Sequence, residues 1–240
     1  MPTLRQNLLA EFFGTMFLVA VAIASVILPM DVLHAGIALS VFIGAISVTF
    51  ALFALIETFS SISGANFNPA VTLALLFSKE TNRTKAAYYM VAQFTGALIG
   101  LLIAHLMFYD THPGIFVVAD QVKTPATFFA EFVGTFILVG VIYGCVRGGS
   151  KHTGLAVACV VGGMFLATSS TMFANPAVTF ARMFTYAICG IAPQSAVFFI
   201  VAEVLGALSA AYVFGHIFPV KMKEKCDPYS CPPQKPITLQ

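Results

Sequence analysis

One phrase of five residues, Asn-Pro-Ala-Val-Thr, occurs twice in this chain, at residues 68–72 and 175–179. Asn is among the best residues for capping a helix N-terminus, and Pro fits the first helical position, where no backbone N–H is needed. Each copy therefore predicts a helix whose N-terminus carries partial positive charge. The first apolar run ends at Phe77, so this helix has about ten residues and spans about half of a hydrocarbon core.

The scarcity of charged residues determines the class of protein. Of 240 residues, 59% are hydrophobic and 9% are charged, whereas a soluble domain has about 25% charged residues. The apolar stretches exceed what barrel strands need, which predicts an all-α membrane protein. Six transmembrane helices are expected at about residues 8–28, 35–55, 86–108, 125–146, 154–168 and 194–218. Two re-entrant half-helices are expected to begin at Asn68 and Asn175.

Short sequences recur in the same order in the two halves of the chain. Residues 10–15 match 130–135, 68–72 match 175–179, and 92–98 match 202–208. Because each half holds an odd number of spans, the second half is expected to be inverted in the membrane. Inverted repeats place a binding or conduction site at the midplane, where interrupted segments meet.

This repeat predicts one channel domain over residues 1–218. Its first repeat is expected at 1–110 and its inverted second repeat at 120–218, followed by a disordered cytoplasmic tail at 219–240.

The distribution of Lys and Arg predicts the orientation. With the N-terminus inside, only Lys123 and Arg182 fall outside. The remaining basic residues, all on the inner side, are Arg5, Lys79, Arg83, Lys85, Arg147, Lys151, Lys221, Lys223, Lys225 and Lys235. This asymmetry follows the positive-inside rule, so we expect a multi-pass protein of the cell (inner) membrane with both termini in the cytoplasm.

Two glutamates, Glu11 and Glu131, lie within apolar spans. A carboxylate inside a membrane is costly and is normally paired or functional. One interpretation is a proton relay, together with Glu203, in a coupled transporter. The other is an acceptor for backbone N–H groups of the re-entrant loops, which meet no water there. The symmetric placement of Glu11 and Glu131 favours the acceptor role.

The duplicated Asn-Pro-Ala, the Glu in the first span of each half, and the sequence Ser-Gly-Ala-Asn-Phe at 63–67 resemble the major intrinsic protein family, the aquaporins and aquaglyceroporins. The resemblance covers about residues 5–218. It implies an aquaporin-like bundle whose half-helices meet at the centre of a pore, assembled as a homotetramer with one pore per subunit. The pore residues it implies are Asn68, Pro69, Ala70, Asn175, Pro176 and Ala177.

The two Asn side chains have a physical role in such a pore. Each Asn caps its helix through its carbonyl oxygen, which leaves the NH2 donors free to face a lumen. A passing water or hydroxyl turns its oxygen toward these donors, which interrupts a proton wire, and the converging helix ends repel cations. Aquaporins are themselves the known example of selectivity by half-helix ends.

The selectivity filter departs from the family pattern. Water channels of the family, and most of its glycerol channels, carry Arg directly after the second Asn-Pro-Ala, where this chain has Val178. Spacing from the two motifs places the other filter positions at Val48 or Thr49, Gly163 and Met172. The resemblance therefore implies a wide, uncharged filter, similar to that of aquaglyceroporin-like channels of bacterial arsenic-resistance operons, whose expected cargo is arsenite or methylated arsenicals.

Two further features leave alternatives open. Arg182 lies one helical turn beyond Val178 and is either a displaced filter arginine or a side chain that snorkels to the outer interface, the second being favoured. In the tail, Cys226 and Cys231 are either a metalloid site or two free thiols, and free thiols are favoured.

These features predict a passive channel for small uncharged solutes, namely water, glycerol-like polyols and neutral arsenicals. A proton-coupled transporter and a water-selective aquaporin remain the alternatives. No nucleophile–base spacing, phosphate loop or His/Cys cluster is present in the sequence, so we expect no enzyme, catalytic residue, metal or cofactor. The expected partners are small neutral solutes and the lipid bilayer, and no nucleic acid.

Overall fold

The structure is a computed structural model that describes residues 2–219. Within that range every regular element is a helix. The elements are α1 (Leu4–Ile27), η1 (Leu28–Val32), α2 (Ile37–Ser63), α3 (Pro69–Phe77), α4 (Arg83–Met107), α5 (Pro125–Gly148), α6 (Thr153–Ala167), α7 (Pro176–Arg182) and α8 (Pro193–Ile217). The tail, with Cys226 and Cys231, lies outside the described residues.

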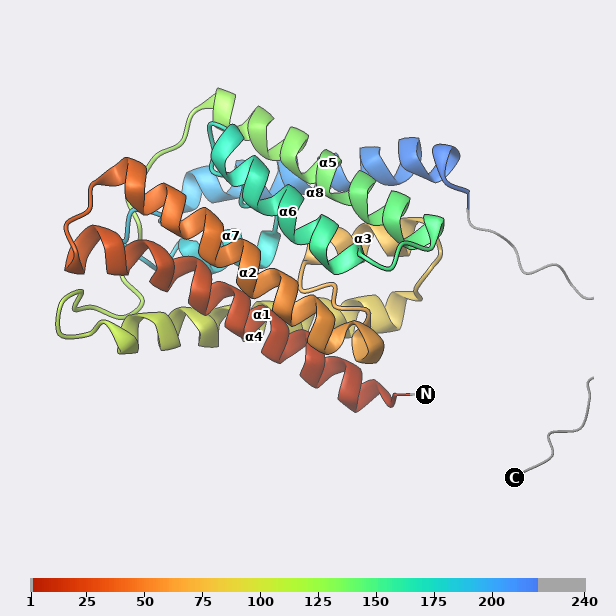
Figure 1. Ribbon diagram of the computed structural model, residues 1–240, viewed down its shortest axis with the longest axis horizontal. Helices are drawn as coiled ribbons and strands as arrows, with labels where there is room; N and C mark the ends of the chain where they lie inside the picture. Colours follow the sequence, from red (N-terminus) through yellow and green to blue (C-terminus); the bar gives the residue numbers. More distant parts are fainter. Residues whose placement is uncertain (1, 220–240) are drawn as a thin grey trace, which may run out of the picture.

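The long helices lie side by side along one axis of the molecule (Figure 1). Helix α1 begins and α8 ends at the same end of the bundle, here called the terminal face. The opposite end holds the connection between α4 and α5 and is called the loop face. The main packing pairs are α1 with α4 and α2, α5 with α8, and α2 with α6. The short helices α3 and α7 lie inside this frame and contact each other.

The predicted all-α membrane fold is confirmed, and the spans differ in length. Five helices are long and apolar enough to cross a membrane: α1 with η1, α2, α4, α5 and α8. The predicted span at 154–168 is the apolar helix α6, which has 15 residues. At 1.5 Å per residue it is about 22 Å long, which is shorter than a hydrocarbon core of about 30 Å.

Helix α2 extends beyond the predicted boundary at residue 55. Its last two turns lie beyond the predicted span and continue the helix to Ser63, and Gly64 ends it with a φ of 93°. Glu57, Thr58 and Ser60 in these turns are exposed. A drop in hydropathy therefore marks where the apolar surface stops, whereas the helix continues until a residue adopts a left-handed conformation.

Glycines permit the closest helix contacts. A Cβ atom at Gly96 of α4 would lie 2.4 Å from the carbonyl oxygen of Phe12, and one at Gly100 would lie 2.2 Å from that of Met16. Gly206 of α8 makes the corresponding approach to Phe132 of α5, at 2.4 Å. Small residues at such contacts let the backbones of membrane helices approach closely.

Candidate functional site

A cavity of about 300 Å³ lies along the middle of the bundle. Its lining extends from Glu80 and Arg147 near the terminal face to Arg182 at the end of α7. Most of the wall is apolar and includes Leu18, Val48, Leu52, Leu138, Val157 and Phe165. Asn68 and Asn175 contribute polar groups in the middle of this path.

Each Asn caps its half-helix, as the sequence predicts. The Oδ1 atom of Asn68 accepts a hydrogen bond from the N–H of Ala70 at 2.8 Å. The Oδ1 atom of Asn175 accepts from Ala177 at 3.0 Å and from Val178 at 3.4 Å. Pro69 and Pro176 occupy the first helical positions.

The NH2 groups are less free than the sequence indicates. The Nδ2 atom of Asn68 donates to the carbonyl oxygen of Ala174 at 2.7 Å, and that of Asn175 donates to Phe67 at 2.9 Å. Since an amide NH2 carries two hydrogens, each Asn keeps one donor for the cavity. These reciprocal bonds join the two half-helices at the centre of the molecule.

The Pro and Ala residues of the two motifs do not line the cavity. Its lining includes both Asn residues but none of Pro69, Ala70, Pro176 and Ala177. Ala70 and Ala177 are completely buried. The Pro residues set the helix start and the Ala residues allow close packing, so of the two Asn-Pro-Ala triplets only Asn68 and Asn175 line the cavity.

The chain before each half-helix has a strained backbone. Phe67 and Ala174 have φ values of 50° and 46°, in the left-handed region that non-glycine residues adopt only at a cost. This turn directs the carbonyl oxygens of Phe67 and Ala174 to the opposite Asn residue. It also leaves backbone N–H groups that need acceptors inside the bundle.

Glu11 and Glu131 supply those acceptors. Glu11 accepts from the N–H groups of Asn66 at 3.0 Å and Phe67 at 2.8 Å. Glu131 accepts from Phe173 at 2.9 Å and from Ala174 at 2.6 Å. Both carboxylates are fully buried and neither lines the cavity.

The structure separates the predicted filter residues into two groups. Val48, Met172 and Val178 line the cavity. Thr49 does not: its hydroxyl donates to the carbonyl oxygen of Ala45 within α2 at 2.8 Å.

Gly163 also lies away from the cavity. It is exposed on the same side of α6 as Leu155, Cys159 and Leu166, whereas the cavity-lining residues of α6 include Val157 and Phe165. The helical periodicity therefore turns Gly163 outward, and the prediction of a filter glycine at this position does not agree with the structure.

Arg182 does not snorkel to an interface, contrary to the favoured interpretation. Its side chain is only 2% exposed and lines the cavity. The Nη2 atom donates to the carbonyl oxygen of Ala22 at 3.3 Å. The guanidinium carbon lies 4.2 Å from the centre of the Phe173 ring. The reason is tertiary: α7 ends inside the bundle, so its last residue cannot reach a lipid surface.

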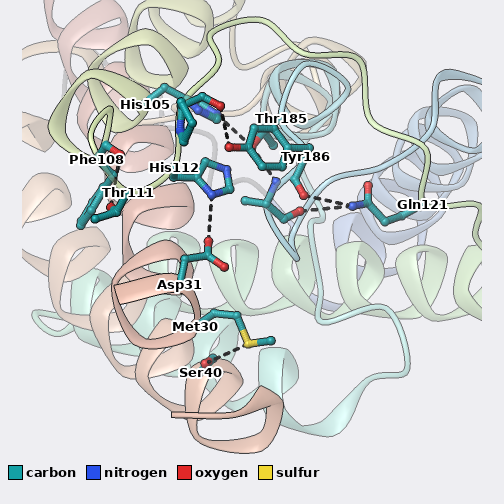
Figure 2. Close-up of polar contacts among 12 residues, drawn as sticks. Met30, Asp31, Ser40, His105, Phe108, Thr111, His112, Gln121, Thr185 and Tyr186 are labelled. Atoms are coloured by element: carbon teal, nitrogen blue, oxygen red, sulfur yellow. Dashed lines mark hydrogen bonds and ion pairs between the residues drawn. The ribbon is translucent and has the colours of Figure 1, made fainter. Parts of the chain in front are cut away.

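A polar cluster at the loop face holds the segment that follows Arg182, and sequence analysis did not identify it (Figure 2). The Nδ1 atom of His112 lies 2.9 Å from a carboxylate oxygen of Asp31. The His112 ring stacks on Tyr186 with a centroid distance of 3.9 Å. The Nε2 atom of His105 lies 2.9 Å from the hydroxyl of Thr185. These residues come from four separate segments, so no local sequence pattern predicts that they form a cluster.

Burial lowers the pKa of His112, and the carboxylate of Asp31 opposes this change. The imidazole is therefore less readily protonated than an ordinary histidine, although it has an acidic neighbour. Its Nε2 atom is buried and has no hydrogen-bond partner among the described residues.

The polar cluster around His112 acts as a clamp at the loop face, and a second clamp lies at the terminal face. Arg147 pairs with Glu80 at 2.5 Å and donates to the carbonyl oxygen of Phe218 at 2.7 Å. Its guanidinium also lies 3.8 Å from the centre of the Tyr143 ring. The clamp joins the ends of α5 and α8 to the loop after α3.

Other candidate chemistry does not assemble within the described residues. Cys145, Cys159 and Cys189 are free thiols there. No group of three or more His, Cys, Asp or Glu side chains in that part of the chain is placed to hold a metal ion.

A bundle of membrane-crossing helices around an axial cavity, with two half-helices meeting at its centre, defines a channel protein. The chain belongs to the major intrinsic protein family, whose sequence model matches residues 1–172. It is 38% identical over 208 residues to "Aquaglyceroporin AqpS" of Rhizobium meliloti (strain 1021), covering 86% of this chain and 88% of that protein. It is 30% identical over 221 residues to "Putative aquaporin NIP4-1" of Arabidopsis thaliana, covering 89% and 75%.

The fold is also similar to the X-ray structure of the aquaglyceroporin from Plasmodium falciparum, with a TM-score of 0.69. That similarity covers 88% of this chain and 95% of the other at 21% identity. The family and its members are channels, so this chain is a multi-pass membrane channel for small solutes and not an enzyme.

Proposed function

We propose that this protein is a passive channel for neutral solutes of glycerol size and larger, including neutral arsenicals, with a wide and uncharged filter. The observation that carries the proposal is Val178, which lines the cavity, as Met172 and Val48 also do. Water-selective members of the family carry Arg at the position where this chain has valine. The relative named as an aquaglyceroporin supports a polyol-sized solute.

The physical argument concerns volume and charge. A guanidinium at position 178 would narrow the ring and offer several fixed donors, whereas valine offers a small apolar surface. Apolar walls with a few donors suit a solute that has both hydroxyl groups and carbon or methyl surface. Water gains nothing from such a wall, which disfavours a water-selective filter.

Passive conduction is supported by the placement of the buried carboxylates. Glu11, Glu131 and Glu203 are fully buried, and none lines the cavity. A proton relay needs groups that exchange protons with the transported path. These three side chains instead accept hydrogen bonds from loop amides and from a threonine hydroxyl.

The proposal extends to topology and assembly. The basic residues of the terminal face support a cytoplasmic location for that face under the positive-inside rule. We propose a homotetramer in the cell (inner) membrane, with residues 1–110 and 120–218 as its two inverted halves and 219–240 as a cytoplasmic tail.

The test is to replace Val178 in purified channels reconstituted into vesicles. Val178→Arg should reduce uptake of glycerol and of a neutral trivalent arsenical by about tenfold or more, and water permeability far less, because the larger solutes need the widened ring. Val178→Leu is the matched control, since it adds bulk without charge. An unchanged ratio of large-solute to water permeability in Val178→Arg would refute the filter assignment.

A second readout addresses the coupled alternative. Uptake should not depend on an imposed proton gradient, so acidifying the outside should leave the final solute level at equilibrium. Accumulation of solute above the outside concentration would favour a proton-coupled transporter.

A further inference from the structure

Arg182 is a buried cation that forms no ion pair with an acidic side chain among the described residues. The ion pairs among the described residues are His112 with Asp31 and Arg147 with Glu80. Neither pair includes Arg182, although its side chain is only 2% exposed to solvent. A guanidinium stays protonated in proteins. An unpaired buried charge is very costly unless polar groups or lumen water solvate it. Arg182 lines the cavity, so water or a solute there can solvate its charge.

The side chain is held in place by contacts that leave donors unused. Its Nη2 atom bonds to Ala22 of α1, and its planar group lies over the ring of Phe173. Phe173 is itself fixed through its N–H, which donates to Glu131. The Nε atom of Arg182 has no partner in the described part of the chain. A guanidinium has five N–H donors; the Nε atom is buried, so the donors left for a solute or for water are those of the Nη groups.

The two halves differ at this position. Arg182 is seven residues beyond Asn175, and the residue seven beyond Asn68 is Leu75. Leu75 and Arg182 both line the cavity. The repeat therefore places an apolar side chain on the terminal side of the centre and a cation on the loop side.

The positive field of Arg182 reaches a neighbouring loop. The pKa of Lys123, at the start of the second half, is lowered first by burial and then by the charge of Arg182.

We propose that Arg182 is the ion-excluding residue of this channel: a fixed cation one helical turn from Val178, which rejects cations and protons and donates hydrogen bonds to neutral solutes. One turn of four residues moves the charge by about 6 Å along α7. The ring at Val178 can then be wide while the path retains a positive barrier. This inference rests on the proposed channel function and assigns charge selection and size selection to different levels of the path.

The test compares ion leak with neutral-solute uptake in the same vesicles. Arg182→Leu, which copies Leu75, should raise proton and sodium leak by at least about tenfold relative to glycerol uptake, because the barrier depends on charge. Arg182→Lys keeps the charge and should remain close to the wild type. Arg83→Leu is the matched control, since Arg83 is exposed and does not line the cavity.

The outcomes separate the two proposals. Wild-type vesicles that take up neither glycerol nor the arsenical would refute the channel function. Wild-type uptake with an unchanged ion leak in Arg182→Leu would refute the role of Arg182 alone. If Arg182→Leu does not insert into the membrane, Arg182→Gln replaces it, because Gln keeps amide donors for Ala22 without the charge. The same ratio of ion leak to glycerol uptake then tests the role of Arg182.

Discussion

The two halves of the channel fix their re-entrant loops with the same residue type but with unequal numbers of hydrogen bonds. In the first half Glu11 accepts four: from the hydroxyl of Ser63 at 2.6 Å, the N–H groups of Asn66 and Phe67, and the amide of Gln93 at 2.7 Å. All four donors are neutral groups, and together they complete the hydrogen bonding of the Glu11 carboxylate.

In the second half Glu131 accepts two, from the N–H groups of Phe173 and Ala174. The residue that corresponds to Gln93 is Glu203, which accepts from the hydroxyl of Thr179 at 2.6 Å and leaves its other oxygen without a partner in the described chain. A carboxyl group lacks the NH2 donors of the Gln amide. The two carboxylates thus share two backbone N–H partners, and their remaining contacts differ.

The largest expected effect is loss of either central carboxylate. Glu11→Leu and Glu131→Leu each leave two buried N–H groups unpaired, at about 1–3 kcal/mol for each group. Glu11→Leu should be the more damaging because Ser63 and Gln93 also lose their acceptor. Thermal unfolding in detergent measures the order, followed by a thiol-reactive dye in a background where every cysteine except the buried Cys189 is replaced by Ser. Glu→Gln at each position is the milder control because it keeps an acceptor oxygen, and equal losses for the two Leu variants would contradict the comparison.

Next in size is the removal of a central Asn. Asn68→Leu and Asn175→Leu each remove an N-cap, worth about 1 kcal/mol, and one bond between the halves, worth about 1 kcal/mol. Both should sharply reduce flux of hydroxylic solutes. Asn175→Leu should destabilise more, since Asn175 caps two N–H groups and Asn68 caps one. Stopped-flow uptake at wild-type rates by correctly inserted protein would show that these residues do not face the solute.

A smaller effect is expected when the second half is made to resemble the first. Glu203→Gln would give Glu131 an amide donor of the kind that Gln93 gives Glu11. We expect stability to be unchanged or to rise by up to about 1 kcal/mol, with Gln93→Glu as the reciprocal variant that should lower it. A clear fall in the unfolding midpoint of Glu203→Gln would show that the second half requires a carboxyl group at this position.

The smallest effect concerns the two clamps at the ends of the bundle. The pKa of His112 is lowered in the folded protein, so its contribution to stability is complete above the usual histidine range and is lost as pH falls through that range. The groups that face it are Asp31, His105 and Tyr186.

Hydrogen–deuterium exchange near residues 108–116 should therefore rise between about pH 7.5 and 5.5, after correction for intrinsic rates. The segment around Arg147 should not respond, because a guanidinium does not titrate. His112→Gln is the control and should abolish the pH response. A similar response at both ends would contradict the assignment to His112.

Sequence alone predicts what depends on local chemistry. The starts of α3 and α7 follow from Asn and Pro at the cap, and the membrane class follows from long uncharged runs. The prediction for Gly163 is wrong because counting back from Asn175 crosses an irregular loop with left-handed residues such as Thr171 and Met172, so the spacing does not report which face of α6 a residue occupies. The interpretation that Arg182 snorkels to an interface is wrong because its partner Ala22 lies 160 residues away, and no spacing rule predicts such a contact.

The reciprocal bonds of Asn68 and Asn175 also affect how the chain is made. Their partners are 106 and 108 residues distant. At a synthesis rate of about 5–20 residues per second, the first half-helix is complete about 5–20 s before its counterpart exists. During that interval its capping amide and the carbonyl of Phe67 lack the partners they have in the finished channel. The centre of the path thus closes only after α7 has been synthesised, and a chaperone or lipid contact that protects it would act in those seconds.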